Sequence, residues 1–358
     1  MTHEPVSDMR ILITGNLGYV GPGVVREFRK YYPHACLIGY DIGYFSQYVT
    51  NQSIIPDAGL SIQYYGDVRV FPDEILEGVD TVIGLAAISN DPIGNRYEEQ
   101  THDINCRAII DLAQRAKDKG AKKFVFASSC SVYGSAEDQP RTENSTLNPL
   151  TAYAKSKINA ETGLRPLAGK NFQVTCLRFA TACGMSDRLR LDLVLNDFVA
   201  GAITNKEISI LSDGTPWRPL IHVLDMARAI RWAHERNGNA GGDFLVANAG
   251  SSAWNYQVRE LAEMVNEILP ETIVSINKDA APDKRSYRVN FDLFAKLAPD
   301  HQPQYNLKTT VLGLIDGLRA IDFRDGNYRN SNLMRLNVIE HLVKTGTIDH
   351  SLFLNNKQ

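Results

Sequence analysis

The chain has few cysteines and no excess of positive charge. Its five cysteines are odd in number and scattered without a Cys-x-x-Cys pair, which argues against a disulfide framework and against a zinc site. A formal net charge of −3 and the lack of a Lys/Arg-rich run argue against nucleic acid as a partner. We therefore expect no bound metal, and reduced core thiols at Cys36, Cys106, Cys130, Cys176 and Cys183.

Long hydrophobic runs are also lacking. The longest ones, such as 81–88 and 124–127, have the size of strands and fall far short of the roughly 18 residues that a membrane span needs. The first eight residues do not have the basic-then-apolar layout of a signal peptide. With 44% hydrophobic and 22% charged residues in 358, the sequence predicts a cytoplasmic globular protein of one large domain or two, without membrane contact.

A short apolar strand and a glycine-rich turn open the chain. Residues 10–14 are rich in β-branched side chains, and the spacing Gly-x-x-Gly-x-x-Gly follows at once, before a helical pattern. Such glycines permit a tight turn and a close approach to a pyrophosphate, to which the helix N-terminus offers N–H groups. A plain tight turn is the alternative. The predicted cofactor contacts here are Gly15, Gly18, Tyr19, Val20 and Gly21.

An acidic residue closes the second predicted strand. The apolar run 36–40 ends in Asp41, at about the distance from the glycine turn at which a carboxylate binds the hydroxyls of an adenine ribose. A carboxylate at this place would repel a 2′-phosphate. The sequence therefore favours NAD over NADP as the cofactor.

Strands and helices alternate through the first half. Further strands are predicted at 61–65, 81–85, 123–127 and 173–178, separated by helical patterns such as 104–117. This alternation predicts an α/β fold with a doubly wound parallel (Rossmann) sheet, in which ligands bind beyond the carboxyl ends of the strands. The residues that follow these strands are therefore further candidates for cofactor contacts: Asp67, Val68, Leu85, Ala86, Ala87, Ser89 and Ser128.

Tyr153 and Lys157 are four residues apart, which is one helical turn. Their side chains therefore share a helix face, and an ammonium group beside a phenol lowers the pKa of the phenol. Such a pair can act as a general base for an alcohol. The same spacing is common on solvated helices, so its interpretation depends on the motifs around it.

Taken together, the glycine turn, the segment 128–134 and the Tyr153/Lys157 pair resemble the extended short-chain dehydrogenase/reductase family, specifically its NAD-dependent epimerase/dehydratase branch of nucleotide-sugar enzymes. The resemblance extends over roughly residues 9–290. Three further segments support it. They are 66–69, similar to an adenine-contacting turn, 103–105, whose Asn105 in relatives braces the cofactor loops, and 218–225 in the substrate half.

The resemblance implies a role for each matching residue. Tyr153 would take the proton of a sugar hydroxyl while hydride leaves the same carbon for NAD, and Lys157 would lower the pKa of Tyr153 and bind the nicotinamide ribose. Ser129 would hydrogen-bond the reacting oxygen. The alternative for 128–131 is a polar strand end that solvates its own backbone. The predicted contacts to a nucleotide-diphosphate sugar are Ser129, Cys130, Ser131, Thr181, Asn196, Arg218 and Arg285. Thr181 departs from the resemblance, because epimerases place an asparagine there, and Asn196 is a further candidate at the start of an amphipathic helix.

The resemblance also narrows the reaction. Members that dehydrate their sugar follow the catalytic hydroxyl with an Asp-Glu pair, where this chain has Cys130 and Ser131. Members that epimerise at C3 and C5 use a cysteine at the Ser131 position, and Cys130 is one residue out of that register, which favours a buried thiol. C4 epimerisation through a transient 4-keto sugar remains, with a 4-dehydrogenase or 4-ketoreductase as the alternative. A non-catalytic dinucleotide-binding sensor is a remote alternative.

The regular alternation breaks up near residue 187. We expect an NAD-binding domain at residues 1–186, a smaller α/β substrate domain at 187–330 that is interleaved with the sheet, and a helical tail at 331–358. Family members usually dimerise through two long helices, and 104–117 and 149–168 are the candidates for a homodimer interface.

Overall fold

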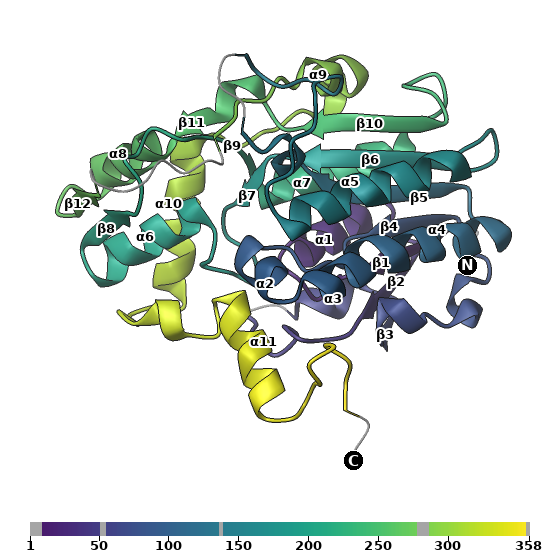
Figure 1. Ribbon diagram of the computed structural model, residues 1–358, viewed down its shortest axis with the longest axis horizontal. Coiled ribbons are helices and arrows are strands. Elements are labelled where there is room, and N and C mark those ends of the chain that lie inside the picture. The colour runs from purple at the N-terminus through teal and green to yellow at the C-terminus, as the bar shows by residue number, and fades with distance from the viewer. Residues whose placement is uncertain (1–8, 51–54, 136–138, 278–285, 356–358) are drawn as a thin grey trace, which may run out of the picture.

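The computed structural model describes residues 9–50, 55–135, 139–277 and 286–355. Seven of its strands are β1 (Arg10–Thr14), β2 (Cys36–Asp41), β3 (Ile62–Tyr65), β4 (Thr81–Gly84), β5 (Lys123–Ser129), β6 (Gln173–Phe179) and β10 (Phe244–Ala249). They form one sheet in the order β10-β6-β5-β4-β1-β2-β3, and every pairing in it is parallel (Figure 1). The predicted doubly wound α/β fold is confirmed.

Helices cover both faces of this sheet, because successive residues of a strand point to opposite faces and both sets are apolar here. Ile11 and Ile13 pack on the side of α1 (Gly21–Tyr31) and α7 (Val223–Glu235). Leu12 packs on the other side, with α4 (Ala108–Asp118) and α5 (Ala152–Leu164). The carboxyl ends of the strands are left free between these layers.

A smaller group of elements lies beyond those carboxyl ends (Figure 1). It has its own apolar core, to which Leu195, Leu261 and Leu314 contribute. Its members are β7 (Thr181–Cys183), α6 (Val194–Thr204), β8 (Glu207–Ile210), β9 (Trp217–His222), β11 (Asn255–Gln257), α8 (Val258–Ile268), β12 (Ile273–Ile276) and α10 (Leu307–Ala320). Since β10 returns to the large sheet between these elements, the two parts are interleaved; the division at residue 186 stays a prediction.

Short helices complete the fold, and two helices differ from their predicted limits. The predicted helix 149–168 begins at Ala152, because the Thr151 hydroxyl accepts the N–H of Ala154 as an N-cap, and a 3-10 turn that contains Pro166 ends it. The predicted helix 104–117 starts with the π-helical turn Asp103–Arg107. The remaining helices are α2 (Asp91–Arg96), α3 (Glu98–His102), α9 (Asp292–Leu297) and α11 (Arg335–Lys344).

The C-terminal helix α11 packs on the cofactor half of the molecule. Val338 and Ile339 are fully buried and belong to the same apolar cluster as Leu12 of the sheet. On the outside, an ion pair between Arg96 and Glu340 ties α11 to α2. The predicted tail is thus part of the wall around the carboxyl ends of the strands.

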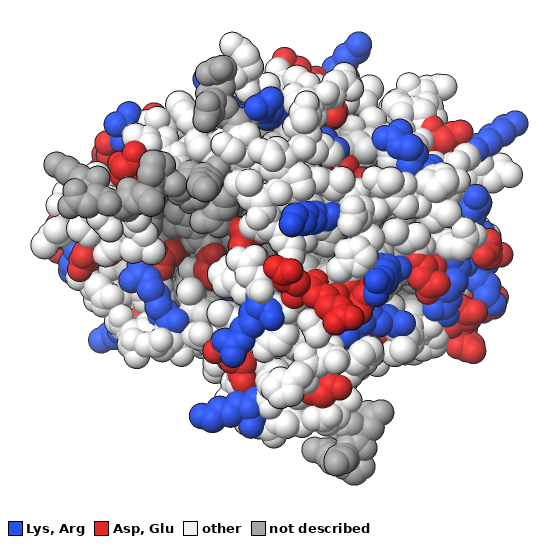
Figure 2. Space-filling view, viewed as in Figure 1, with Lys and Arg blue, Asp and Glu red and all other residues white. Residues whose placement is uncertain are grey.

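The surface carries both signs of charge. On the face shown in Figure 2, Lys and Arg side chains are interspersed with Asp and Glu. Among the residues with a described placement, none of the helices has the length and apolar character needed to cross a bilayer.

Candidate active site

A pocket of about 920 Å³ lies at the carboxyl ends of β1 to β6. Its size is typical of a site for small organic ligands. The wall also takes side chains from the smaller group of elements and from α11. The sequence-predicted residues that line it are Gly15, Gly18, Tyr19, Val20, Asp41, Asp67, Val68, Leu85, Ala86, Ala87, Ser89, Ser128, Ser129, Ser131, Tyr153, Lys157, Thr181 and Arg218.

The glycine turn after β1 requires its glycines. Gly15 has φ +76°, and a Cβ there would lie 2.4 Å from the backbone nitrogen of Ala86 in the loop after β4. Gly21 does not line the pocket. A Cβ at this position would lie 1.9 Å from the carbonyl oxygen of Asn16, so this glycine lets α1 begin directly against the turn. The turn and the N-terminus of α1 therefore fit the pyrophosphate of a dinucleotide.

One carboxylate ends β2 and another follows β3. Asp41 accepts the N–H groups of Leu17 (3.0 Å) and Gly43 (2.7 Å), and burial raises the pKa of its carboxyl group. Asp67 accepts the N–H of Arg69 (2.8 Å) and pairs with its guanidinium. Both side chains line the pocket in fixed orientations, which fits the adenosine end of NAD.

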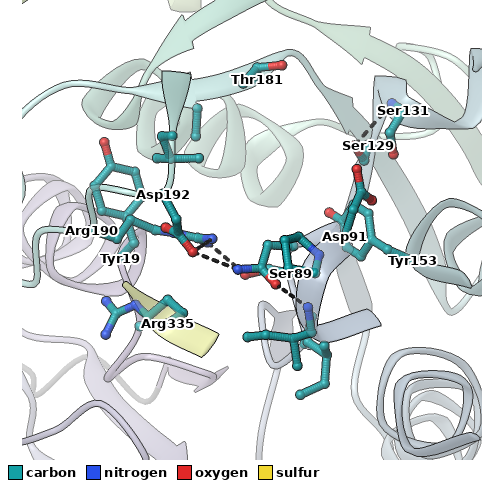
Figure 3. Close-up of a pocket in the computed structure, with 18 of the residues that line it drawn as sticks. Tyr19, Ser89, Asp91, Ser129, Ser131, Tyr153, Thr181, Arg190, Asp192 and Arg335 are labelled. Atoms are coloured by element: carbon teal, nitrogen blue, oxygen red, sulfur yellow. Dashed lines mark hydrogen bonds and ion pairs between the residues drawn. The ribbon is translucent and has the colours of Figure 1, made fainter. Parts of the chain in front are cut away.

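Tyr153 and Ser129 lie together at the end of β5 (Figure 3). The Ser129 side chain lies close enough to the Tyr153 phenol to lower its pKa, and the Ser129 hydroxyl accepts the N–H of Ser131 (3.2 Å). One turn further along α5, the Lys157 ammonium donates to the carbonyl oxygen of Ala127 (2.7 Å). The three residues predicted to be catalytic are therefore on one wall of the pocket.

Burial sets the proton affinities of this wall. It raises the pKa of Tyr153 to about 12, against a smaller lowering by the hydrogen bond to Ser129, and it lowers the pKa of Lys157 to about 7. In the chain by itself, desolvation is the largest influence on the Tyr153 pKa, and the Lys157 ammonium lies 5.5 Å from the phenol ring centroid, so the lowering of this pKa by Lys157 stays a prediction.

Two predicted substrate contacts lie outside the pocket. Cys130 is fully buried, its thiol contacts the carbonyl oxygen of Arg178 (3.1 Å), and burial raises the pKa of the thiol. Asn196 is also fully buried, where its side chain accepts the N–H of Gly184 (3.0 Å) and donates to the carbonyl of Arg190 (3.0 Å). Neither side chain lines the pocket, and both hold backbone in place, so the structure gives no support to these two substrate contacts. Arg285 lies outside the described residues.

Two other predicted residues support the pocket through hydrogen bonds. Asn105 does not line the pocket, but its amide accepts the N–H of Ile88 (2.8 Å) and donates to the carbonyl of the same residue (2.8 Å). The Ser128 hydroxyl donates to Glu161 (2.6 Å), which pairs with Arg178. Asn105 therefore holds the loop after β4, and Ser128 holds the end of β5.

Several charged side chains of the wall were missed from the sequence. Arg190 pairs with Asp192 and donates to Ser89 (2.9 Å), while Asp192 accepts from Asn90 (2.6 Å), so this pair joins the loop after β7 to the loop after β4 (Figure 3). The alternation of charged and apolar residues in 188–192 was a signal that could have found them. Asp91, Tyr287, Arg329 and Arg335 also line the pocket.

The comparisons with known proteins agree with this geometry. The model of the NAD dependent epimerase/dehydratase family matches residues 11–247. UDP-glucose 4-epimerase from Lactobacillus helveticus is 30% identical over 287 residues, which cover 74% of this chain and 84% of that relative.

Solved structures show the same fold. MoeE5 in complex with UDP-glucose and NAD superimposes with a TM-score of 0.74 at 22% identity, over 87% of this chain and 99% of that one. The NAD-dependent NDP-hexosamine 5,6-dehydratase TunA superimposes with a TM-score of 0.75 at 21% identity, over 89% of this chain and 99% of that one. With the family match over residues 11–247 and a pocket that fits NAD, the chain belongs to the NAD dependent epimerase/dehydratase family and is an NAD-dependent nucleotide-sugar enzyme of the extended short-chain dehydrogenase/reductase type.

Proposed function

We propose that the protein is a nucleotide-sugar 4-epimerase in which Tyr153 is the base. The observation that supports this most is the placement of Tyr153 and Ser129 at one end of the pocket that the glycine turn also lines. Tyr153 accepts the proton of the C4 hydroxyl, and Ser129 hydrogen-bonds the same oxygen. Bound NAD would supply the hydride acceptor for the oxidation at C4 and the hydride donor for the reduction on the other face of the sugar.

The residues after Ser129 favour a reaction at a single carbon. Dehydration needs an acid and a base besides the tyrosine, but Cys130 is buried beneath the pocket and Ser131 presents only a hydroxyl, whose oxygen is buried without a hydrogen-bond partner. In Figure 3 the carboxylate nearest to Tyr153 is that of Asp91, which belongs to α2 and not to the segment after Ser129. Oxidation and reduction at C4 require one proton acceptor, and Tyr153 is sufficient for that.

The substrate needs an anchor that leaves its sugar free to turn. Arg218 on β9 lines the pocket, and a guanidinium suits the oxygens of a diphosphate. We infer that Arg218 holds the nucleotide diphosphate. Thr181, nearby on β7, offers a hydroxyl, which is a weaker donor than a guanidinium. The name of the Lactobacillus helveticus relative and the ligand of MoeE5 make UDP-hexoses the first substrates to test.

The test separates the epimerase from its alternatives. Purified protein is denatured and the released NAD(H) assayed, and the native protein is incubated with UDP-, GDP-, dTDP- and CDP-sugars. Retained cofactor and inversion at C4, followed by NMR, with no net change in absorbance at 340 nm, are the expected results. Stoichiometric accumulation of free NADH would instead identify a 4-dehydrogenase, and a 4-keto-deoxy product would identify a dehydratase.

A further inference from the structure

The C-terminal helix contributes an arginine to the pocket wall. Arg335, the first residue of α11, is 3% exposed and lines the pocket. One amino group, Nη2, donates to the carbonyl oxygen of Arg188 (3.1 Å), and the guanidinium lies 4.1 Å from the ring centroid of Phe45. The other amino group, Nη1, is buried without a hydrogen-bond partner. This leaves a strong donor of the wall unsatisfied.

Among the residues that the structure describes, the charge of Arg335 also has no direct counter-ion. Arg188 pairs with Asp57 and Arg190 pairs with Asp192, but within the described part of the chain no carboxylate is within ion-pair distance of Arg335. Burial, with a smaller contribution from the charge of Arg190, lowers the pKa of Arg335 to about 9, although the charge of Asp192 acts in the opposite direction. A buried, unpaired cation is unfavourable, so this part of the wall is suited to an anion.

The surroundings of Arg335 place that anion on the cofactor side of the pocket. Phe45 belongs to the loop after β2, the strand that ends in the ribose carboxylate Asp41. In Figure 3, Arg335 lies on the side of Tyr19 and Arg190, away from Tyr153. Tyr19 is part of the glycine turn. In a dinucleotide that contacts both a ribose-binding carboxylate and a glycine turn, the pyrophosphate lies between these two contacts.

We propose that Arg335 binds the pyrophosphate of the dinucleotide, so that α11 is part of the cofactor site. The free Nη1 donates to a phosphate oxygen in a charge-assisted hydrogen bond. This inference deepens the proposed function, because an epimerase must keep its NAD from the oxidation of the sugar until its reduction. It depends on the cofactor and not on which sugar carbon reacts.

The segment after α11 couples the helix to the adenosine end of the site. Arg69, beside Asp67, donates to the carbonyl oxygens of Ser351 (2.7 Å) and Leu352 (2.8 Å), and its guanidinium lies 3.4 Å from the ring centroid of Phe353. The Tyr44 hydroxyl donates to the carbonyl of Leu352 as well. The loops after β2 and β3 therefore hold the segment that follows α11.

The test measures ligand binding to NAD-free protein by calorimetry, with NAD, NADP, ADP-ribose, adenosine and UDP as ligands. Arg335→Met should weaken the binding of NAD and of ADP-ribose by roughly 10- to 100-fold, because the variant loses one hydrogen bond to a charged group. The affinities for adenosine and UDP should stay unchanged. Arg335→Lys should restore part of the loss. Arg96→Met is the matched control, because it removes another arginine contact of α11, to Glu340 at the surface, and should leave every affinity unchanged.

Each alternative outcome overturns the proposal. Unchanged affinity for ADP-ribose in Arg335→Met would show that Arg335 binds no cofactor phosphate. A loss confined to UDP would place it at the substrate diphosphate, and a loss confined to NADP would place it at a 2′-phosphate. If circular dichroism shows that Arg335→Met does not fold, the same affinities are measured for Arg335→Lys. An affinity of this variant for ADP-ribose equal to that of the wild type would then overturn the proposal. Binding of ADP-ribose involves no sugar, so failure of the epimerase assay leaves this measurement valid.

Discussion

At the scale of the residue, Tyr153 and Lys157 share a face of α5, yet burial governs both. Their spacing predicted a shared face correctly, but not the desolvation that keeps Tyr153 protonated and brings the pKa of Lys157 to about 7. Desolvation depends on what covers the pair, and the cover comes from distant parts of the chain. The same reason explains why Arg190 and Arg335 were missed, whereas glycines and strand-end carboxylates could be identified from local patterns.

Replacing Tyr153 by phenylalanine tests its role as the base. The change removes the proton acceptor and keeps the ring, so we expect turnover to fall by roughly 10²- to 10⁴-fold while the NAD content of the purified protein stays the same. Tyr31→Phe, at a side chain that is 44% exposed on α1, is the control. Activity that survives in Tyr153→Phe would show the mechanistic assignment to be wrong.

Burial of His234 predicts a pH dependence of stability. Its pKa falls from 6.5 to about 4 in the folded chain, mainly through desolvation. Between these values the unfolded chain binds a proton that the folded chain does not, so stability decreases as the pH falls below about 6.5. From pH 7 to pH 5 this group should cost about 2 kcal/mol.

Urea unfolding at the two pH values measures this effect. In His234→Gln the loss of stability between pH 7 and pH 5 should be smaller than in the wild type by that amount, whereas His341→Gln, at an exposed position of α11, should show the wild-type loss. Equal losses in all three proteins would contradict a neutral, buried His234.

At the scale of the element, the six strands predicted in the first half match β1 to β6 to within one or two residues, because apolar β-branched runs between glycines and polar residues are local signals. The helix that carries Tyr153 and Lys157 was predicted too long, since the cap at Thr151 and the turn around Pro166 were not recognised. The helical spacing in the tail was recognised, but its docking site was not. Docking depends on the apolar surface of a distant layer, which no local pattern describes.

Ile339 tests whether α11 is held by that layer. The side chain is fully buried in the cluster that includes Leu12, so Ile339→Ala should lower the free energy of unfolding by about 2–5 kcal/mol. Urea unfolding gives the value. Leu312→Ala, at a residue of α10 that is 40% exposed, should change it by no more than about 0.5 kcal/mol. A similar, small effect at both positions would mean that α11 is not packed on the sheet layer in solution.

At the scale of the whole molecule, we propose a homodimer that forms through α4 and α5. These helices lie on the same face of the large sheet and contact each other. Light scattering should then give a mass of about 80 kDa, twice the 39.8 kDa of one chain. Thr162→Arg, on the exposed side of α5, should produce monomers, whereas Leu312→Arg on α10 should not. A wild-type mass near that of one chain would refute the proposal.

The position of β10 late in the sequence limits where the chain can be cut into fragments that fold. β10 covers the edge of β6, but it belongs to residues 244–249, well beyond the predicted boundary at residue 186. A fragment that ended at this boundary would keep the glycine turn and Tyr153, yet it would expose the unpaired backbone and apolar side chains of β6, such as Val174 and Cys176. Uncovered edges of this kind pair with other chains. A chain truncated at residue 186 would therefore aggregate and would not fold as an independent cofactor-binding domain.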